Sequence, residues 1–276
     1  DKMSVQNFIF VLAGQSNMSG RGGLREKNGK IKFRPSTPVE QLLTQRHDKI
    51  FMMDKRGVWK YAREPLHRDI DLSATACGIG PGYAFAHSLI RLIDEDNSTE
   101  NDSPHKIQRL DKVYHEDRPE TTIGLVPCAE GGSSILEWGD GGFLYERMVN
   151  RTRLAMDQGD KQLRGLLWFH GETDAKREED ALLYRARLRD FILRVRRDLG
   201  EELIIFLVAI SGSIEDLPHQ RLIRSATAEM RRVFKNIMIV DSGKLPVSRT
   251  ELHLSSDAQY ELGKQMAKMY FDRYVI

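Results

Sequence analysis

A serine near the N-terminus and a histidine near the C-terminus are the residues best suited by type to covalent catalysis. Ser16 lies in the segment Gly14-Gln15-Ser16-Asn17, directly after the apolar run Phe8–Ala13, and His253 precedes the last predicted helix. A serine hydroxyl is a weak nucleophile until a neighbouring imidazole takes its proton. We therefore interpret Ser16 as a nucleophile and His253 as its base, although a lone segment of this kind is more typical of a polar turn after a strand.

Acyl transfer through a serine also needs hydrogen-bond donors for the oxyanion and a carboxylate that orients the imidazole. Gly131-Gly132 suits the first role, because glycine lets backbone N–H groups come close to a substrate oxygen. The same glycine pair is equally consistent with a turn or a helix start. No set of histidine, cysteine or carboxylate residues has metal-ligand spacing, and His170 and Glu172, on one short loop, come nearest. The residues thus favour serine chemistry without a metal.

These residues need a scaffold that brings distant segments together, and the hydrophobic pattern predicts a parallel sheet. Five short apolar runs read as buried strands, because they are continuous rather than alternating. They are Phe8–Ala13, Thr122–Pro127, Gly165–Phe169, Leu203–Ala209 and Ile237–Val240, with Ile50–Met53 as a weaker sixth candidate. Helical patterns lie between them at Tyr83–Ile93, Phe143–Met156, Glu178–Leu199, Leu217–Phe234 and Ser255–Tyr274. This alternation indicates an open α/β sheet covered on both faces.

The candidate residues follow the predicted strands, which supports a common site. In open α/β sheets, ligands bind beyond the carboxyl ends of the strands. Ser16 follows the first strand, Gly131-Gly132 the second, and His170-Gly171-Glu172 the third, while His253 comes after the fifth. We expect a single domain over residues 1–276. Two polar insertions, at Leu24–Leu72 and Asp94–Thr121, are expected to border the site or to form surface loops.

Composition narrows the range of partners and compartments. The 42 basic and 40 acidic residues are well mixed, which argues against nucleic acid or an anionic membrane as the main partner. No apolar run reaches the ~18 residues that a membrane-spanning helix needs. Cys77 and Cys128 could form a disulfide, but we favour two buried thiols. Three glycosylation-type sequons, and no convincing signal peptide, are consistent with either a cytoplasmic or a secreted location.

The block Gly14-Gln15-Ser16-Asn17-Met18-Ser19-Gly20, with the serine first and the histidine last, resembles the SGNH/GDSL hydrolase superfamily. More closely, the chain is similar to the carbohydrate esterases of family six, in their plant-type branch, and to the related sialate O-acetylesterase domain. Supporting matches span nearly the whole chain in the family's order: Cys77–Gly82, Val126–Ile135, Trp168–Ala175 and Leu252–Leu254.

The resemblance implies a flavodoxin-like, three-layer α/β/α sandwich with a central parallel five-stranded sheet. It implies a serine esterase that removes O-acetyl groups from carbohydrate of the acetylxylan type or similar, with no metal or organic cofactor. An acetylated carbohydrate is then the partner, and no oligomeric state is implied. By carry-over, Ser16 is the nucleophile and His253 the base. The backbone amides of Ser16 and of Gly131 or Gly132 donate to the oxyanion.

Two positions depart from the superfamily pattern. The acid commonly lies three residues before the histidine, where this chain has Thr250. Glu172 is the preferred replacement, because the equivalent glutamate supports the histidine in some relatives. Glu251 is the second choice, since its side chain points away from His253 if that segment is extended. A backbone carbonyl that holds the histidine is the third possibility.

The second departure concerns the side-chain donor to the oxyanion. Thr173 stands where the superfamily has asparagine, and His170 stands where the family more often has glutamine. A threonine hydroxyl can donate a hydrogen bond, but with a different reach. Gln15, Asn17 and His170 are the alternatives.

Two other functions remain compatible with the sequence. The missing acid at Thr250 is compatible with a catalytically weakened member that binds carbohydrate without turning it over. A lipase- or thioesterase-like hydrolase of the same superfamily is the other alternative, although no long apolar stretch outside the predicted strands and helices suggests an acyl-chain channel.

Overall fold

A seven-stranded sheet forms the centre of the molecule, in the strand order β5-β4-β6-β1-β7-β8-β9. The computed structural model describes residues 6–101, 120–247 and 252–275. The strands are β1 (Gln6–Gly14), β4 (Ile50–Met53), β5 (Trp59–Tyr61), β6 (Thr121–Pro127), β7 (Lys161–Phe169), β8 (Ile204–Ala209) and β9 (Ile237–Asp241). All neighbours pair in parallel except β5, which is antiparallel to β4.

The predicted α/β fold with a parallel sheet is confirmed, and the sheet is wider than the five strands expected. All five predicted strands form, and the weaker candidate Ile50–Met53 pairs in parallel with β6. The remaining strand, β5, escaped prediction because Trp59-Lys60-Tyr61 is a short and largely exposed edge strand. Such a segment carries no continuous apolar run that would indicate a buried strand.

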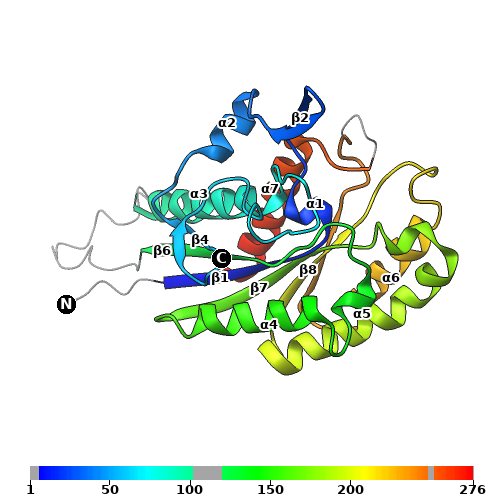
Figure 1. The fold of residues 1–276 in the computed structure, drawn as a ribbon. Coiled ribbons are helices and arrows are strands. Elements are labelled where there is room, and N and C mark those ends of the chain that lie inside the picture. The colour runs from blue at the N-terminus through cyan, green and yellow to red at the C-terminus, as the bar shows by residue number, and fades with distance from the viewer. Residues whose placement is uncertain (1–5, 102–119, 248–251, 276) are drawn as a thin grey trace, which may run out of the picture.

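Helices cover both faces of this sheet and make three layers (Figure 1). One face packs against α3 (Pro81–Asn101) and α7 (Ser256–Tyr274). The other packs against α4 (Phe143–Met156), α5 (Glu178–Leu199) and α6 (Gln220–Val233). The apolar face of α5 is buried, and Gly200 ends that helix with a positive φ of 132° that favours glycine.

The second predicted insertion, Asp94–Thr121, begins later than expected. Helix α3 continues through Asp94 to Asn101, and β6 starts at Thr121. Residues 94–101 are mostly polar and acidic, so they lack the apolar period that would have indicated a helix. Residues 102–119 lie outside the described part of the chain.

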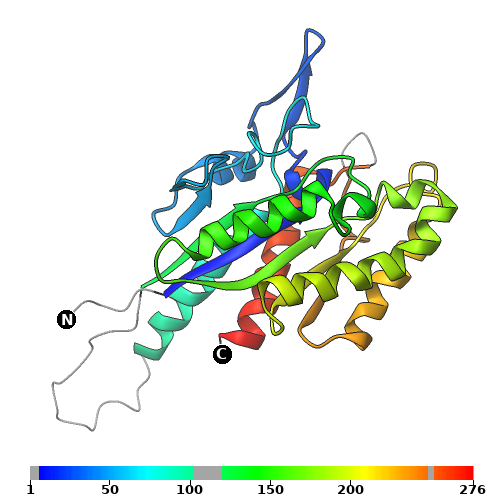
Figure 2. The ribbon, with the colours of Figure 1, turned by 60° about the horizontal axis from the view of Figure 1, so that its bottom comes forward.

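The first insertion carries small elements of its own. A hairpin of β2 (Leu24–Lys27) and β3 (Lys30–Phe33) projects from the body of the molecule, and α2 (Pro38–Thr44) follows it (Figure 2). The insertion then supplies β4 and β5 to the edge of the central sheet. The segment expected to border the site or to form surface loops is therefore partly built into the fold.

The core lies on both faces of the sheet, and its buried side chains include both cysteines. Cys77 and Cys128 are free thiols, as favoured from the sequence. Burial raises the pKa of the Cys77 thiol to about 12, so this thiol stays protonated at neutral pH. No helix within the described ranges is long and apolar enough to cross a membrane.

Candidate active site

A tight turn at the end of β1 places Ser16 at the carboxyl edge of the sheet. Gly14 ends the strand with a φ of 127°, and a Cβ atom there would lie 2.1 Å from the carbonyl oxygen of Phe169 on β7. The Gln15 amide donates to that same carbonyl at 3.0 Å. The short helix α1 (Ser16–Ser19) then begins directly at the serine. The turn thus aims the Ser16 hydroxyl at the space between two strand ends.

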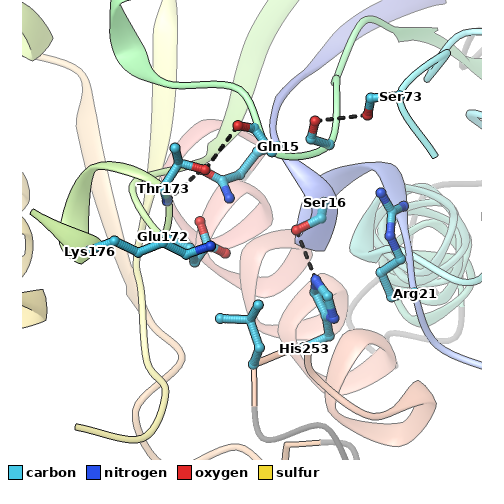
Figure 3. A pocket seen from close by; sticks show the side chains of 11 residues that line it. Gln15, Ser16, Arg21, Ser73, Glu172, Thr173, Lys176 and His253 are labelled. Carbon is cyan, nitrogen blue, oxygen red and sulfur yellow. Dashed lines mark hydrogen bonds between the residues drawn. The ribbon is translucent and has the colours of Figure 1, made fainter. Parts of the chain in front are cut away.

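The structure brings Ser16 and His253 together although 237 positions separate them in the sequence. The Nε2 atom of His253 lies 3.0 Å from the Oγ atom of Ser16 (Figure 3). Burial, reinforced by the positive charges of Arg21 and Lys176, lowers the pKa of His253 to about 4. The imidazole is therefore neutral at pH 7 and can accept the serine proton.

Asn17 fixes the segment that carries His253. Its Oδ1 atom accepts from the Leu254 amide at 3.0 Å, and its Nδ2 atom lies 3.4 Å from the Leu252 carbonyl oxygen. The Gln259 side chain, from the first turn of α7, also donates to the Asn17 oxygens. Asn17 therefore clamps both chain neighbours of the histidine.

Glu172 supports this clamp and makes no hydrogen bond with the ring of His253. Its Oε1 atom accepts from Asn17 Nδ2 at 2.7 Å, and its Oε2 atom is buried without a hydrogen-bond partner. Burial raises the pKa of Glu172. In the described part of the chain no carboxylate is hydrogen-bonded to the ring of His253. The alternative acid, Glu251, and Thr250 lie outside the described residues.

Gln15 presents an amide group to the pocket beside Ser16. Its Oε1 atom accepts hydrogen bonds from the backbone amides of Gly171 at 3.3 Å and Thr173 at 3.4 Å. Both partners are N–H donors, so the side-chain oxygen must face them. The Nε2 group is consequently turned toward the pocket (Figure 3).

The other three candidate side-chain donors are directed elsewhere. The Thr173 hydroxyl donates to the Gly132 carbonyl at 3.0 Å, and the Asn17 amide is engaged in the clamp. His170 is buried between the rings of Trp168 and Tyr184 and does not line the pocket. Burial lowers the pKa of His170 to about 3, which keeps this ring neutral. His170 thus packs as a core histidine.

The two glycines after β6 line the pocket in different surroundings. A Cβ atom on Gly131 would come within 2.4 Å of the Arg21 guanidinium, whereas one on Gly132 would meet nothing within 4 Å. The carbonyl oxygen of Gly131 accepts from the Ser73 hydroxyl at 2.8 Å. Gly132 has a φ of 72° and faces open space. The backbone of this loop is therefore accessible at Gly132.

A charged cluster that the sequence did not reveal forms one wall of the pocket beside Ser16. The Asp71 carboxylate accepts from Ser19 at 2.6 Å, from Ser73 at 2.7 Å and from Arg21 at 2.9 Å. Burial alone would raise the pKa of Asp71, but these partners and Gly131 hold it at about 2. Asp71 and Ser73 flank the end of the first insertion, so no strand pattern pointed to them. Only the position of Arg21, directly after the Ser16 block, could have suggested its place in the site.

The resulting pocket has a volume of about 300 Å³. It is lined by Gln15, Ser16, Arg21, Ser73, Gly131, Gly132, Glu172, Thr173, Lys176, Leu252 and His253. A buried hydroxyl next to a neutral imidazole, with amide donors nearby, can carry out acyl transfer to water. Within the described ranges no group of histidine, cysteine and carboxylate side chains could hold a metal ion.

Comparison with known proteins decides the family. A family model described as carbohydrate esterase, sialic acid-specific acetylesterase, matches residues 6–100 and 109–272. The chain belongs to this family of carbohydrate esterases. The resemblance inferred from the Ser16 block and its four supporting matches is confirmed, and the enzyme class of an esterase follows from it.

Individual relatives of this carbohydrate esterase agree over its whole length. A probable carbohydrate esterase of Arabidopsis thaliana is 34% identical to this chain over a match of 282 residues. The match covers 99% of this chain and 96% of the relative. The X-ray structure of that Arabidopsis protein has a TM-score of 0.81 at 32% identity, covering 98% of this chain and 99% of the other.

More distant solved structures support the fold alone. NanS has a TM-score of 0.65 at 16% identity and covers 99% of this carbohydrate esterase and 100% of its own chain. A carbohydrate acetylesterase from Xanthomonas citri has a TM-score of 0.59 at 17% identity, covering 95% of this chain and 55% of the other. The three-layer arrangement therefore recurs in proteins of low sequence similarity.

Proposed function

We propose that this carbohydrate esterase removes O-acetyl groups from carbohydrate through an acetyl-enzyme on Ser16. The observation that carries the proposal is the 3.0 Å contact between Ser16 Oγ and the neutral His253 Nε2 inside a small pocket. The family description and the name of the Arabidopsis relative support an acetylated carbohydrate as the substrate. An acetylxylan-type polysaccharide or a similar one is the substrate we propose.

The reaction takes two steps that use the same two side chains. Ser16 Oγ attacks the acetyl carbonyl carbon while His253 Nε2 accepts the hydroxyl proton. The tetrahedral intermediate then collapses, and the sugar oxygen leaves with the proton from His253. A water molecule, deprotonated by His253, attacks the acetyl-enzyme next. Release of acetate returns the proton to Ser16 Oγ, and the enzyme is restored.

Three donors can stabilise the oxyanion of each intermediate. The Ser16 amide is at the start of α1, where backbone N–H groups have no intrahelical partner. The second is the amide of Gly132, which is exposed and lines the pocket, whereas Gly131 is hemmed in by Arg21 and Asp71. The Gln15 Nε2 group is the side-chain donor we propose, because its oxygen is fixed by two backbone amides.

We assign Glu172 a positioning role. It holds Asn17, and Asn17 holds the backbone on both sides of His253. A neutral histidine that is fixed in this way can act as a base without a carboxylate on its ring, as in a serine–histidine pair. The orientation that a carboxylate gives directly in other triads would here come from the clamp.

Two alternatives from the sequence are disfavoured by specific features. A member that only binds carbohydrate would not require the contact between Ser16 and a neutral His253. A lipase- or thioesterase-like enzyme would require room for a long acyl chain, but the pocket is about 300 Å³ and carries Arg21 and Lys176. The small volume of the pocket and its two positively charged side chains favour a short acyl group such as acetyl.

Replacement of the nucleophile tests the proposal. Ser16→Ala should lower acetate release from an aryl acetate and from acetylated xylan by at least about a thousandfold, because no acetyl-enzyme can form. It should also abolish labelling by a fluorophosphonate probe. Ser211→Ala is the matched control, since Ser211 follows β8 at the same sheet edge but bonds to Ser242 and does not line the pocket. Wild-type turnover in Ser16→Ala would refute the assignment.

A further inference from the structure

A second hollow adjoins the catalytic pocket on the side of α4. Its volume is about 430 Å³, and it is lined by Leu72, Glu130, Glu137, Gly142, Phe143, Leu144 and Arg147. Leu72 and Glu130 are the chain neighbours of Ser73 and Gly131, which line the catalytic pocket. Consecutive Cα atoms are about 3.8 Å apart. The two hollows therefore share a wall made of two adjacent residue pairs.

Two large apolar side chains that line this second hollow are exposed to solvent. Phe143 is 70% exposed and Leu72 is 78% exposed. Phe143 is the first residue of α4, which begins at the carboxyl edge of the sheet where Ser16 also lies (Figure 1). Core packing does not explain either side chain, and exposed apolar groups beside a cleft mark binding surfaces.

Arg147 lies beside the aromatic ring. Its guanidinium lies 5.6 Å from the centre of the Phe143 ring. The same guanidinium donates to Glu130 at 2.9 Å and to the Cys128 carbonyl at 3.0 Å, so it is itself fixed. The Phe143 ring is thus exposed to solvent and lies beside a guanidinium whose position is fixed by hydrogen bonds.

Polar groups around the ring complement hydroxyls. Glu130 accepts from the Ser73 amide at 2.8 Å and from Arg147. Glu137 accepts from the Ser134 amide at 2.7 Å through Oε2, and no donor among the described residues contacts its Oε1. An aromatic face bordered by carboxylates matches a pyranose ring, which has apolar C–H faces and hydroxyls at its edge.

We propose that this hollow is a subsite for a second sugar ring, adjacent to the ring whose acetyl group enters the catalytic pocket. The substrate is then an acetylated oligosaccharide or polysaccharide rather than an acetylated monosaccharide. This inference rests on the proposed esterase function. Because the shared wall is short, the ring on Phe143 belongs to the same glycan chain as the acetylated one.

The subsite is tested by comparing a long substrate with one that cannot reach it. For Phe143→Ala, the ratio of kcat/KM for acetylated xylo-oligosaccharides to kcat/KM for an aryl acetate should fall about tenfold, mainly through KM. Phe143→Trp, which keeps an aromatic face, should retain the ratio. Leu193→Ala is the control: this leucine is 43% exposed on α5 and lines neither hollow. An unchanged ratio in Phe143→Ala would overturn the proposal.

Direct binding separates the subsite from the esterase activity. Unacetylated xylotetraose should give saturation-transfer NMR signals with the wild-type protein, and Phe143→Ala should lose most of them. If these signals depend on Phe143 while no acetylated carbohydrate is hydrolysed, the esterase proposal fails and the sugar site stands. If Phe143→Ala binds xylotetraose as the wild type does, the subsite is wrong whatever the hydrolytic activity.

Discussion

Asn17 is the side chain through which Glu172 reaches the segment that carries the histidine. The amide forms hydrogen bonds with Glu172 and with the Leu254 amide, and it lies near the Leu252 carbonyl. Glu172 can serve this clamp as a hydrogen-bond acceptor whether or not it is ionised. Burial raises its pKa, which makes the neutral form easier to populate than in water. The role proposed here therefore needs an oxygen atom, and not a negative charge.

This distinction predicts different effects for two substitutions at one position. Glu172→Gln keeps an oxygen that can accept from Asn17, so kcat should stay within about threefold of the wild-type value. Glu172→Ala removes the acceptor, loosens His253, and should lower kcat by about 10- to 100-fold, as losses of supporting residues typically do. Steady-state kinetics with an aryl acetate give both values.

The same kinetics can contradict the positioning role. A loss in Glu172→Gln as large as in Glu172→Ala would show that the charge matters, as for a true triad acid. Asn17→Ala adds a second check, because residues of one hydrogen-bonded chain act together. The double variant Asn17→Ala/Glu172→Ala should lose little more than Asn17→Ala does alone.

The sequence indicated part of this site, and the unpredicted part has a physical reason. Ser16 and His253 could be recognised because each follows a predicted strand of a parallel sheet, whose carboxyl ends converge. The link from Glu172 through Asn17 is a contact between positions 155 residues apart, and no spacing rule reveals such a contact. Arg21 and Asp71 escaped notice because an ion pair of two surface-type residues has no sequence signature.

At the level of elements, the junction of β1 and α1 depends on close backbone contact between neighbouring strands. Gly14 has a φ of 127°, and Gly200, at the end of α5, has a φ of 132°. The two glycines have nearly the same positive φ, which would strain any other residue, but they differ in the free space around them. A Cβ atom at Gly14 would overlap the Phe169 carbonyl at 2.1 Å, while one at Gly200 would meet nothing within 4 Å.

This pair predicts two stability losses of different size. Gly200→Ala should lower the free energy of unfolding by about 1 kcal/mol, from backbone strain alone. Gly14→Ala should lower it by about 3 kcal/mol, because β1 and β7 must also move apart. Urea unfolding measures both, and the aryl acetate assay should show that only Gly14→Ala disturbs Ser16. Equal losses in the two variants would mean that the overlap at Phe169 is relieved without cost.

The elements themselves followed from the sequence wherever burial imposes a pattern. Helices α4 and α5 have the predicted bounds, because each presents an apolar face with a 3.6-residue period to the sheet. The end of α3 and the edge strand β5 did not follow, since the first is a run of polar residues in the sequence and the second is largely solvent-exposed, so neither carries such a pattern. Burial, more than intrinsic propensity, made an element predictable here.

For the molecule as a whole, Glu40 connects the first insertion to the last helix. Its carboxylate accepts from Ser256 at 2.7 Å, from the Ser36 amide at 2.7 Å and from Arg25 at 3.0 Å. Burial alone would raise the pKa of Glu40, but these partners and the Thr37 amide hold it at about 2. The insertion, which carries Asp71 and borders Ser73, is thus tied to the helix that follows His253.

The low pKa of Glu40 makes the free energy of unfolding depend on pH in the acidic range. The folded-state pKa of about 2 lies below the ordinary value of 4.5, so the contribution of Glu40 is fully present above pH 4.5. It should be lost as the pH falls from 4.5 toward 2, by up to about 1.4 kcal/mol per pH unit.

Glu40→Gln should therefore be less stable than the wild type at pH 7, with a shallower loss of unfolding free energy below pH 4.5. Glu26→Gln, at an exposed position on β2, should reproduce the wild-type slope in the same urea titrations. An identical slope in Glu40→Gln would show that other carboxylates account for the acid sensitivity, and that the insertion docks without the help of the Glu40 carboxylate.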